Sequence, residues 1–450
     1  MNELKNFPYK NVLVLGLAKS GMAAATFLMK NNKRVIVNDL GASEEDKDVQ
    51  ELRAKGAQVV LGSHPLSLLN NIDIIVKNPG IPYENVLIKE AIKQDIPIIT
   101  EIELASLLIG NRMIGITGSN GKTTTTTLIY DMFMQAHKKV KLAGNIGTVA
   151  TEVASQMTND EQMIVELSSF QLLGTRTFKP KVAILLNIYE AHLDYHGTME
   201  NYIEAKFNML NNQDDNDIVI FNKDNSHIRE HIAQATSQKI PFSIKEKNID
   251  GGWVNDDAVF YKDEKVIERK DIRLVGDHNL ENILAAICCA KVNDISNEVI
   301  KRVLMTFSGV EHRLQFVEEI NERLFYNDSK ATNILATKKA LAAFNQPTIL
   351  LAGGLDRGND FKEIIPALKH VKAMVLFGET KEKLKAAGDE ANIEHIIFAE
   401  NVKEATIKAF EQSAKGDVIL LSPACASWDQ YRTFEERGNE FIQTLKTIHK

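Results

Sequence analysis

The chain alternates short apolar runs with longer stretches in which apolar positions recur at helical spacing. The apolar run Val12–Leu15 is followed by a turn of small residues, by a helical pattern over Met22–Lys30 and by a second apolar run at Arg34–Val37. Short apolar runs bounded by turns are typical of buried strands, and regular alternation of strands with helices predicts a parallel sheet. We therefore predict an α/β protein.

The same alternation continues along the chain and divides it into three parts. Further strands are predicted at residues 59–61, 72–76, 96–99, 113–116, 163–165, 182–186, 218–221, 348–351, 373–377 and 418–421. Residues 238–273 are richer in charge and turns, and Asp250-Gly251-Gly252 predicts a hairpin tip. Because a length of 450 residues suggests roughly three domains, we predict domains at 1–109, 110–309 and 310–450.

The composition excludes several classes of protein. Hydrophobic residues make up 44% of the chain and charged residues 25%, as in ordinary soluble globular proteins. No run approaches the ~18 consecutive apolar residues of a membrane helix, and the polar start Met1–Asn6 does not resemble a signal peptide. The net charge of -7, without a basic block, disfavours nucleic acid binding. We expect a cytoplasmic monomer that neither binds nucleic acid nor inserts into a membrane.

A glycine-rich loop follows the predicted strand at 113–116 and precedes a helical pattern over Leu128–Ala136. In such a strand–loop–helix unit, backbone N–H groups and the positive end of the helix bind phosphate oxygens. Lys122 would neutralise the β- and γ-phosphates of ATP, and the Thr123 hydroxyl would bind Mg²⁺. The residues that we predict to hold ATP here are Gly118, Ser119, Asn120, Gly121, Lys122, Thr123 and Thr124.

Three features in or near the loop have both a functional and a structural interpretation. The strict phosphate-loop pattern would have glycine at position 116, where this chain has Ile116, so a loop with a merely exposed lysine is the alternative. Glu166 directly follows the strand at 163–165, at the end where α/β proteins place ligand groups, but it could also be a surface residue. Five polar residues lie between Asn187 and His196; among them, His192 could bind a metal, act as a base or pack.

Taken together, several motifs resemble the Mur ligase family. They are Thr117–Thr124, Glu166–Gln171, Asn187–His192, Lys206, Asp277–Asn279, Asn282, Glu311–Arg313 and Asp328–Asn333. The resemblance covers essentially the whole chain and implies a Rossmann-like N-terminal domain, a central P-loop ATP-binding domain with a parallel sheet and a Rossmann-like C-terminal domain. This family uses ATP to join an amino acid to a carboxylate in peptidoglycan synthesis.

Three further segments are similar to the branch of the family that adds D-glutamate. They are Gly16–Gly21, Gly353–Gly358 and Leu421–Gln430. The DNPR motif of the branch that adds diaminopimelate or lysine is absent, and Gly354–Arg357 stands in its place. The resemblance thus implies addition of D-glutamate to UDP-N-acetylmuramoyl-L-alanine through an acyl phosphate. Those two molecules are the expected partners, and ATP and two Mg²⁺ ions are the expected cofactors.

The resemblance also implies roles for individual side chains. Catalytic roles are implied for Lys122, Glu166, His192 and Lys206. Thr123 and Glu166 would hold the Mg²⁺ ion of the nucleotide, whereas His192 would bind a second ion together with Lys206 as a carbamate. From its helical pattern over residues 201–210 alone, Lys206 would be a solvated lysine.

Binding roles are implied for three more sets of residues. The set for the nucleotide is Asn279, Arg313 and Asp328. The set for the uridine substrate is Leu17, Lys19, Ser20, Asp39, Asn78, Gly80 and Asn145. The set for D-glutamate is Lys330, Thr332, Ser427, Trp428 and Phe434. The alternatives are ordinary turn chemistry in the first domain, a surface ion pair for Arg313 and a core position for Trp428, and the role of Arg357 stays open.

Three other functions compete with this interpretation. Another ATP-dependent amide ligase, such as folylpolyglutamate synthase, would be expected to lack the pattern at Ser422–Gln430. A P-loop switch or transport ATPase offers no reason for Lys206 or for two additional α/β domains. A nicotinamide dehydrogenase is disfavoured because Ala18 stands where the second glycine of a dinucleotide-binding loop belongs.

Overall fold

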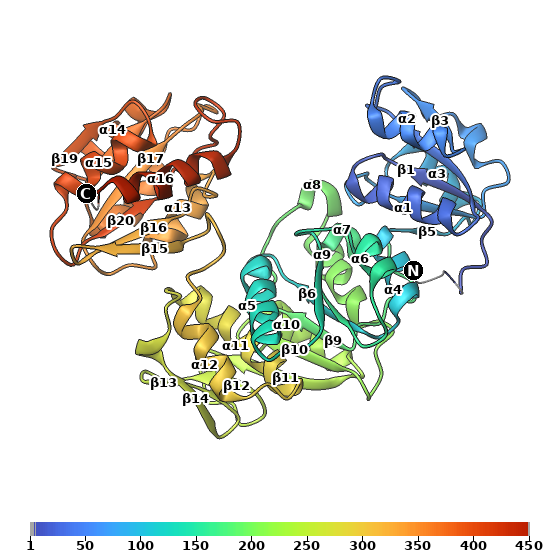
Figure 1. Ribbon diagram of the computed structural model, residues 1–450, viewed down its shortest axis with the longest axis horizontal. Helices are drawn as coiled ribbons and strands as arrows, with labels where there is room; N and C mark the ends of the chain where they lie inside the picture. Colours follow the sequence, from blue (N-terminus) through green and yellow to red (C-terminus); the bar gives the residue numbers. More distant parts are fainter. Residues whose placement is uncertain (1–3, 5, 449–450) are drawn as a thin grey trace. The chain divides into compact units, whose positions relative to one another are not determined.

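The computed structural model describes Leu4 and residues 6–448. In this part of the chain the strands form three sheets, of five, nine and six strands (Figure 1). The predicted α/β class with three sheet-containing domains is confirmed, while the bounds at 109 and 309 stay predictions. By compactness the chain divides into a first unit, residues 1–269 with 281–303, and a second unit, residues 270–280 with 304–450.

The first sheet is wholly parallel, with strand order β3-β2-β1-β4-β5. Its strands are β1 (Asn11–Leu15), β2 (Arg34–Asp39), β3 (Gln58–Leu61), β4 (Ile74–Lys77) and β5 (Ile98–Ile99). The helices of this region are α1 (Lys19–Lys30), α2 (Lys47–Ala54), α3 (Val86–Lys93) and α4 (Glu101–Ile109). Because β2 and β4 flank β1, the segments that follow these three strands meet at one edge of the sheet.

The second sheet carries the glycine-rich loop at its centre. Its order is β14-β13-β12-β11-β10-β9-β6-β8-β7. The strands are β6 (Met113–Thr117), β7 (Val140–Gly144), β8 (Gln162–Glu166), β9 (Val182–Leu185), β10 (Ile218–Asn222), β11 (Gln238–Ser243), β12 (Gly252–Val254), β13 (Ala258–Tyr261) and β14 (Glu264–Glu268). Since β8 and β9 run parallel to β6 on either side, their carboxyl ends place Glu166 and Asn187 next to the loop.

Helices surround the second sheet and attach it to the first. They are α5 (Lys122–Gln135), α6 (Ala150–Gln156), α7 (Ser169–Leu172), α8 (Leu193–His196), α9 (Met199–Phe207), α10 (Ser226–His231), α11 (Asp277–Val292) and α12 (Asn297–Thr306). Buried Glu101 of α4 accepts hydrogen bonds from the backbone N–H (2.9 Å) and the hydroxyl (2.6 Å) of Thr151 in α6. Unpaired buried carboxylates are costly, so these bonds stabilise the junction between the two sheets.

The predicted hairpin tip at Asp250–Gly252 is wrong. Gly252 begins β12, which runs parallel to β11, and the hairpin lies further along, between β12 and β13. A Cβ on Gly251 would lie 1.8 Å from the carbonyl oxygen of Pro241, and one on Gly252 would lie 2.8 Å from Cys288 Sγ. The two glycines therefore allow close packing against neighbouring segments rather than a tight turn.

The third sheet has the order β15-β16-β20-β17-β18-β19. Of the strands described in this sheet, only β15 runs antiparallel to the others. Its strands are β15 (Gln315–Ile320), β16 (Arg323–Asn327), β17 (Thr348–Gly353), β18 (Val371–Phe377), β19 (His395–Phe398) and β20 (Val418–Leu421). The helices are α13 (Ile334–Leu341), α14 (Lys381–Glu390), α15 (Val402–Gln412) and α16 (Phe434–Ile448). Since β20 lies between β16 and β17, the loops after these three strands meet.

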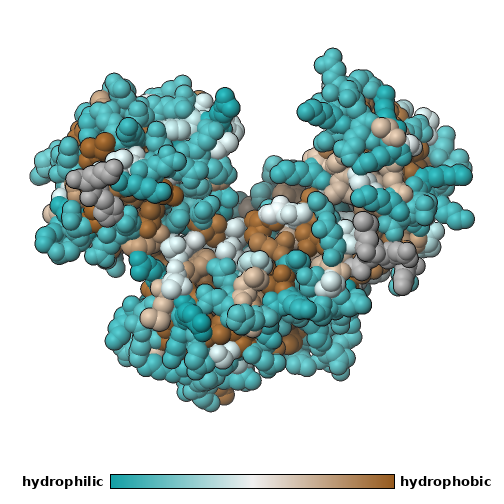
Figure 2. All heavy atoms as spheres, viewed as in Figure 1, coloured by the Kyte–Doolittle hydropathy of each residue, from teal (hydrophilic) through white to brown (hydrophobic). Residues whose placement is uncertain are grey.

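The remaining helical segments are short 3-10 helices at Leu66–Leu69, Asn208–Leu210, Ile232–Gln234, Arg269–Asp271 and Lys362–His370. On the face shown in Figure 2, hydrophilic residues (teal) cover most of the outer surface of each unit. The apolar strand positions are buried; Val12, Ile164 and Leu420, one from each sheet, are examples. None of the described helices combines the length and apolarity that a membrane crossing requires.

Candidate active site

The glycine-rich loop is held in place by the segment that follows the neighbouring strand β9. The N–H of Ser119 donates to the carbonyl of Asn187 at 2.8 Å, and the N–H of Asn120 donates to the Asn187 side-chain oxygen at 2.8 Å. The Asn187 amide returns a hydrogen bond to the carbonyl of Asn120 at 3.2 Å. Asn187 thus fixes the loop. The sequence identified it only as one member of a polar cluster.

A second set of contacts anchors the middle of the loop. The Ser119 hydroxyl lies 2.9 Å from the Tyr202 hydroxyl and accepts a hydrogen bond from the N–H of Tyr189 at 2.9 Å. Gly121 has a φ of +82°, and a Cβ there would lie 2.1 Å from Asn282 Oδ1, so glycine is required for both reasons. Lys122 begins α5, whose N-terminal end therefore faces the loop. This combination suits an anion such as a nucleotide phosphate.

Two lysine amines converge on one carbonyl group of the loop. Lys122 Nζ donates to the carbonyl oxygen of Gly118 at 2.8 Å, and Lys206 Nζ donates to the same atom at 3.0 Å. Lys206 is only 2% exposed, so the interpretation as a solvated lysine is wrong. Burial, reinforced by the charge of Lys122, holds the pKa of Lys206 well below its ordinary value. Lys206 is thus a buried amine that shares one acceptor with a second lysine.

Glu166 lies at the end of β8, paired in register with Ile116 of β6. It is 1% exposed, which excludes the surface role. One carboxylate oxygen, Oε1, accepts a hydrogen bond from the Asn145 side chain at 2.9 Å, whereas the buried Oε2 has no hydrogen-bond partner. A buried, unpaired carboxylate oxygen is unfavourable unless a ligand completes it. This oxygen therefore fits a cation such as Mg²⁺.

His192 and His196 begin and end the same helical turn but have different surroundings. His192 adopts a left-handed backbone with φ +56°, and its ring lies edge-on to Phe170 at 4.9 Å. Burial, together with the charges of Lys206 and Lys122, lowers the pKa of His192, which favours the neutral imidazole that binds metals. His196 is instead buried beside Ser169 Oγ at 3.0 Å, and burial lowers its pKa to about 4.

Protein side chains alone do not form a complete metal site. Among the residues that the structure describes, no group of three or more His, Cys, Asp or Glu side chains could hold a metal ion. Mg²⁺ usually keeps several waters and binds one or two carboxylates together with substrate phosphates. The unpaired oxygen of Glu166 and the hydroxyl of Thr123 fit this pattern, as would an additional anionic oxygen on Lys206.

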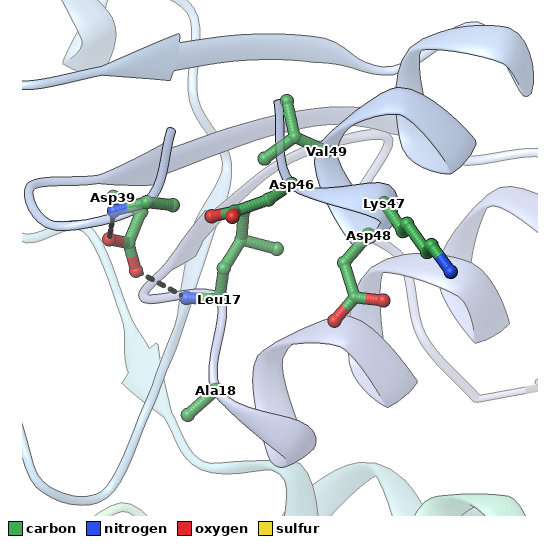
Figure 3. A pocket seen from close by; sticks show the side chains of 8 residues that line it. Leu17, Ala18, Asp39, Asp46, Lys47, Asp48 and Val49 are labelled. Carbon is green, nitrogen blue, oxygen red and sulfur yellow. Dashed lines mark hydrogen bonds between the residues drawn. The ribbon is translucent and has the colours of Figure 1, made fainter. Parts of the chain in front are cut away.

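A pocket in the first sheet contains two of the residues predicted for the uridine substrate (Figure 3). Its lining residues are Leu17, Ala18, Asp39, Ala42, Asp46, Lys47, Asp48 and Val49. Asp39 accepts hydrogen bonds from the N–H groups of Leu17 at 2.6 Å and of Gly41 and Ala42 at 2.8 Å each. Burial opposes the charge of Asp39, but these backbone donors outweigh it and lower the pKa. The contribution of Asp46–Val49 was not predicted.

The other residues predicted for the uridine substrate divide into two places. The Asn78 amide donates to Ser20 Oγ at 3.0 Å, and its oxygen accepts from the N–H of Gly80 at 3.1 Å, so these three lie together. Lys19 is exposed at the start of α1. Asn145 lies apart from them, where it holds Glu166 at the carboxyl edge of the second sheet.

In the second unit, Asp328 joins two loops. Its carboxylate accepts hydrogen bonds from the N–H of Leu314 at 3.0 Å and from Ser422 Oγ at 2.8 Å. Burial raises the pKa of Asp328 to about 7, although the charge of half-buried Arg313 and both hydrogen bonds oppose this rise. In the first turn of α11, buried Asn279 donates to the carbonyl of Val275 at 2.7 Å.

Among the residues predicted for D-glutamate, Lys330 lies beside the ring of Phe434, and Arg357, whose role stayed open, lies beside the ring of Trp428. Lys330 Nζ lies 5.3 Å from the ring centre of Phe434, and the Arg357 guanidinium lies 4.9 Å from that of Trp428. Trp428 is 64% exposed, so the alternative of a core position is wrong. Ser427 is buried and Thr332 is half-buried. Lys330 and Arg357 thus place two cations beside these rings, and cationic side chains of this kind suit a dicarboxylate.

Arg437 was not predicted, yet it connects the loops that carry these residues. It is fully buried and donates to the carbonyls of Ser329 (2.8 Å), Cys425 (3.0 Å) and Gly353 (3.4 Å). The carbonyls of Ser329 and Cys425 belong to the segments after β16 and β20, and that of Gly353 to the last residue of β17. The sequence shows Arg437 only as a polar position in a helix, so nothing in the local pattern indicates this role.

Comparison with known proteins identifies the family along the whole chain. Residues 10–100 match the Mur ligase MurD-like N-terminal domain, residues 116–290 the Mur ligase middle domain, and residues 312–425 the Mur ligase glutamate ligase domain. The UDP-N-acetylmuramoylalanine--D-glutamate ligase of Oceanobacillus iheyensis is 59% identical over 448 residues, covering 100% of both chains. The Bacillus pumilus protein of the same name is 53% identical over 450 residues, again covering 100% of both.

Solved structures share the fold at much lower identity. The UDP-N-acetylmuramate-alanine ligase MurC of Thermotoga maritima matches with a TM-score of 0.58 and 17% identity, over 98% of this chain and 100% of that one. The MurF ligase of the same organism, in complex with ADP, has a TM-score of 0.57 and 16% identity, over 100% and 98%. These two matches concern the fold alone. The full-length relatives settle the family, and the chain belongs to the Mur ligases.

Proposed function

We propose that this chain is an ATP-dependent ligase that adds D-glutamate to UDP-N-acetylmuramoyl-L-alanine in peptidoglycan synthesis. The observation that carries this proposal is the 59% identity, over the full length of both chains, to a relative with that activity in its name. The phosphate loop, the buried amine of Lys206 and the Arg357 guanidinium beside Trp428 support it. Neither the dehydrogenase nor the transport ATPase accounts for all three of these features.

The chemistry begins with the activation of a carboxylate. An oxygen of the L-alanyl carboxylate attacks the γ-phosphorus of ATP, the bond to the bridging oxygen of ADP breaks, and an acyl phosphate forms. The amine of D-glutamate then attacks the acyl carbon, loses a proton and expels phosphate. Because anionic groups must approach one another, catalysis depends on positioning and on neutralisation of charge. We assign Lys122 and the N-terminal end of α5 to the phosphates.

Mg²⁺ would be held by protein oxygen and nitrogen atoms around the loop. Thr123 and Glu166 would bind the ion of the nucleotide, because the buried Glu166 Oε2 has no partner of its own. His192 and a carbamate on Lys206 would bind the second ion. Bound Mg²⁺ withdraws charge from the phosphate oxygens. For the carbamate, the neutral amine of Lys206 attacks CO₂ and releases one proton, which leaves an anionic oxygen where an ammonium would otherwise stand.

Substrate binding is assigned to three groups of residues. For the uridine substrate they are Leu17, Lys19, Ser20, Asp39, Asn78, Gly80 and Asn145. For the nucleotide they are Asn279, Arg313 and Asp328, in addition to Gly118–Thr124. For D-glutamate they are Lys330, Thr332, Ser427, Trp428 and Phe434, and we add Arg357 because it stacks on Trp428. A cytoplasmic location agrees with the use of ATP. A monomer stays a prediction, which sedimentation of the purified chain would test.

The function is tested by measuring phosphate release with ATP and UDP-N-acetylmuramoyl-L-alanine. The amino acid is varied among D-glutamate, L-glutamate, L-lysine and meso-diaminopimelate. We expect release with D-glutamate alone, and loss of that release in Lys122→Met. Release with L-lysine but not with D-glutamate would refute the assignment. The exposed Lys89 on α3 provides a control variant, Lys89→Met, that should retain full activity.

A further inference from the structure

Lys77 is a buried lysine that neither the sequence nor the proposed chemistry accounts for. It is the last residue of β4 and directly precedes the loop Asn78–Ile81, which contains two residues assigned to the uridine substrate. Its side chain belongs to the first sheet, and it is only 1% exposed. Lysine is almost never fully buried unless its amine is satisfied by acceptors. The acceptors of Lys77 therefore indicate its purpose.

The amine of Lys77 is surrounded by oxygen atoms from two parts of the first unit. From the loop itself, Nζ donates to the carbonyls of Ile81 at 2.7 Å, Pro79 at 3.1 Å and Asn78 at 3.3 Å. From α8, beside the second sheet, it donates to the hydroxyl oxygen of Tyr195 at 3.0 Å. That hydroxyl lies within hydrogen-bond distance of the same carbonyls, 3.0 Å from Ile81 and 3.1 Å from Pro79.

Two aromatic rings complete the surroundings of this amine. Nζ lies 5.0 Å from the ring centre of Tyr83 and 5.8 Å from that of Tyr195. The partial negative charge of carbonyl oxygens and of ring faces attracts a cation. A carbamate at this position would instead place an anion among oxygen atoms. The contacts therefore suit an ammonium group that holds two segments together, and not a modified or nucleophilic amine.

The two segments joined by Lys77 carry different halves of the proposed reaction. On one side, Asn78 bonds to Ser20 and to the N–H of Gly80, so the loop is continuous with the uridine-substrate residues. On the other side, Tyr195 lies in the helical turn that begins at His192, and its ring packs edge-on against Phe170 at 4.5 Å. Phe170 also contacts the ring of His192.

We propose that Lys77 is a positioning residue that, through Tyr195, fixes the loop Asn78–Ile81 against α8 and so aligns the bound uridine substrate with the catalytic edge of the second sheet. This inference rests on the proposed function. Without Lys77 the loop loses a hydrogen-bond donor shared by three carbonyls, and the substrate is presented less accurately. We therefore expect loss of Lys77 to weaken binding of the uridine substrate and to leave binding of ATP and of D-glutamate unchanged.

The test compares steady-state kinetics of the full chain with those of Lys77→Met, Tyr195→Phe and the exposed control Lys89→Met. Methionine keeps the length and apolar body of lysine but removes its donors, and phenylalanine keeps the ring of tyrosine. We expect Lys77→Met to raise the KM for UDP-N-acetylmuramoyl-L-alanine about tenfold, with the KM for ATP and for D-glutamate changed less than about twofold. Tyr195→Phe should give a smaller rise of the same KM, and Lys89→Met none.

Calorimetric binding of UDP-N-acetylmuramoyl-L-alanine to the same variants gives a readout that does not depend on turnover. A weaker affinity in Lys77→Met supports the inference even if the wild type prefers another amino acid, which separates this test from that of the proposed function. Equal changes in all three KM values, or a fall in kcat with no change in any KM, would overturn it. Should Lys77→Met fail to fold, Tyr195→Phe decides: an unchanged KM for the uridine substrate contradicts the proposal.

Discussion

Two buried lysines in the first unit, Lys77 and Lys206, have nearly the same exposure but differ in what surrounds their amines. They are 1% and 2% exposed, and burial lowers the pKa of both, that of Lys77 to about 7. The amine of Lys77 is surrounded by three carbonyls, a hydroxyl and two rings. The amine of Lys206 shares the carbonyl of Gly118 with a second cation, Lys122.

The difference teaches that burial alone does not decide what a lysine does. Acceptors around Lys77 offset part of the cost of burying its amine, so the residue works as a shared hydrogen-bond donor that joins two segments. At Lys206, burial and then the charge of Lys122 lower the pKa, so a second cation adds to the cost of an ammonium there. Only a neutral amine can react with CO₂. Since burial lowers the pKa of both amines, the expectation of a carbamate at Lys206 and not at Lys77 rests on their neighbours: carbonyl and hydroxyl oxygens enclose the amine of Lys77, whereas a second lysine amine lies beside that of Lys206.

The largest expected effect follows from removal of the Lys206 side chain. Lys206→Ala should lower turnover on the order of 10³-fold, because it deletes an anionic ligand next to the reacting phosphate. Short carboxylates such as acetate should restore part of the activity, as measured by phosphate release. Lys77→Met should not respond to acetate, since it lacks a cation. Full activity of Lys206→Ala without additives would contradict the proposed role.

Glu166→Gln should have the next largest effect. Glutamine can still accept the hydrogen bond from Asn145, but it removes the charge of the buried oxygen that has no partner. We expect kcat to fall about 100-fold and the Mg²⁺ concentration for half-maximal rate to rise. A titration of the rate with Mg²⁺ checks both. Glu152→Gln, on the exposed side of α6, is the matched control. An equal loss of kcat in this control would contradict the role of Glu166 in binding Mg²⁺.

Arg437 extends the comparison to the second unit, because carbonyls surround it as they surround Lys77. Burial lowers the pKa of Arg437 to about 10, which leaves it charged at neutral pH. Arg437→Lys keeps the charge but loses the fork that reaches Ser329, Cys425 and Gly353. We expect the KM for D-glutamate to rise about fivefold and the KM for the uridine substrate to stay constant. The reverse pattern would show that these loops do not carry the D-glutamate site.

The smallest expected effect is a difference in the pH dependence of stability. Since the folded-state pKa of Lys77 is about 7 and its ordinary value is 10.5, the unfolded chain binds more protons between these pH values. Stability should therefore rise with pH across this window, because the cost of the buried ammonium is complete below pH 7 and disappears towards pH 10.5. The melting temperature of the wild type should rise more from pH 7 to pH 9 than that of Lys77→Met. Parallel shifts would mean that Lys77 does not titrate there.

The elements that sequence reasoning found are those whose signal is local. The apolar runs at 12–15, 163–165 and 418–421 correspond to β1, β8 and β20 within about one residue, because parallel strands buried on both faces are continuously apolar. The phosphate loop could also be predicted, since its glycines, lysine and threonine lie close together in the sequence. The prediction of a hairpin tip at Asp250–Gly252 was wrong because glycine occurs at sites of close packing as well as in turns.

The residues that sequence reasoning missed depend on contacts between distant segments. Lys77 and Tyr195 are 118 positions apart, and the partners of Arg437 are backbone carbonyls that any sequence would provide. Burial of Lys206 was equally hidden, because a lysine in a helical pattern is normally solvated. Its importance was expected only from the family resemblance, and its proximity to Lys122 gives that expectation a physical reason.

The most direct test of the contrast between the two lysines is ¹³C NMR of the full chain equilibrated with ¹³C-bicarbonate. The account predicts a carbamate carbon resonance in the wild type, its retention in Lys77→Met and its loss in Lys206→Ala. A resonance that survives in Lys206→Ala, or one that disappears in Lys77→Met, would contradict the assignment of the carbamate to Lys206.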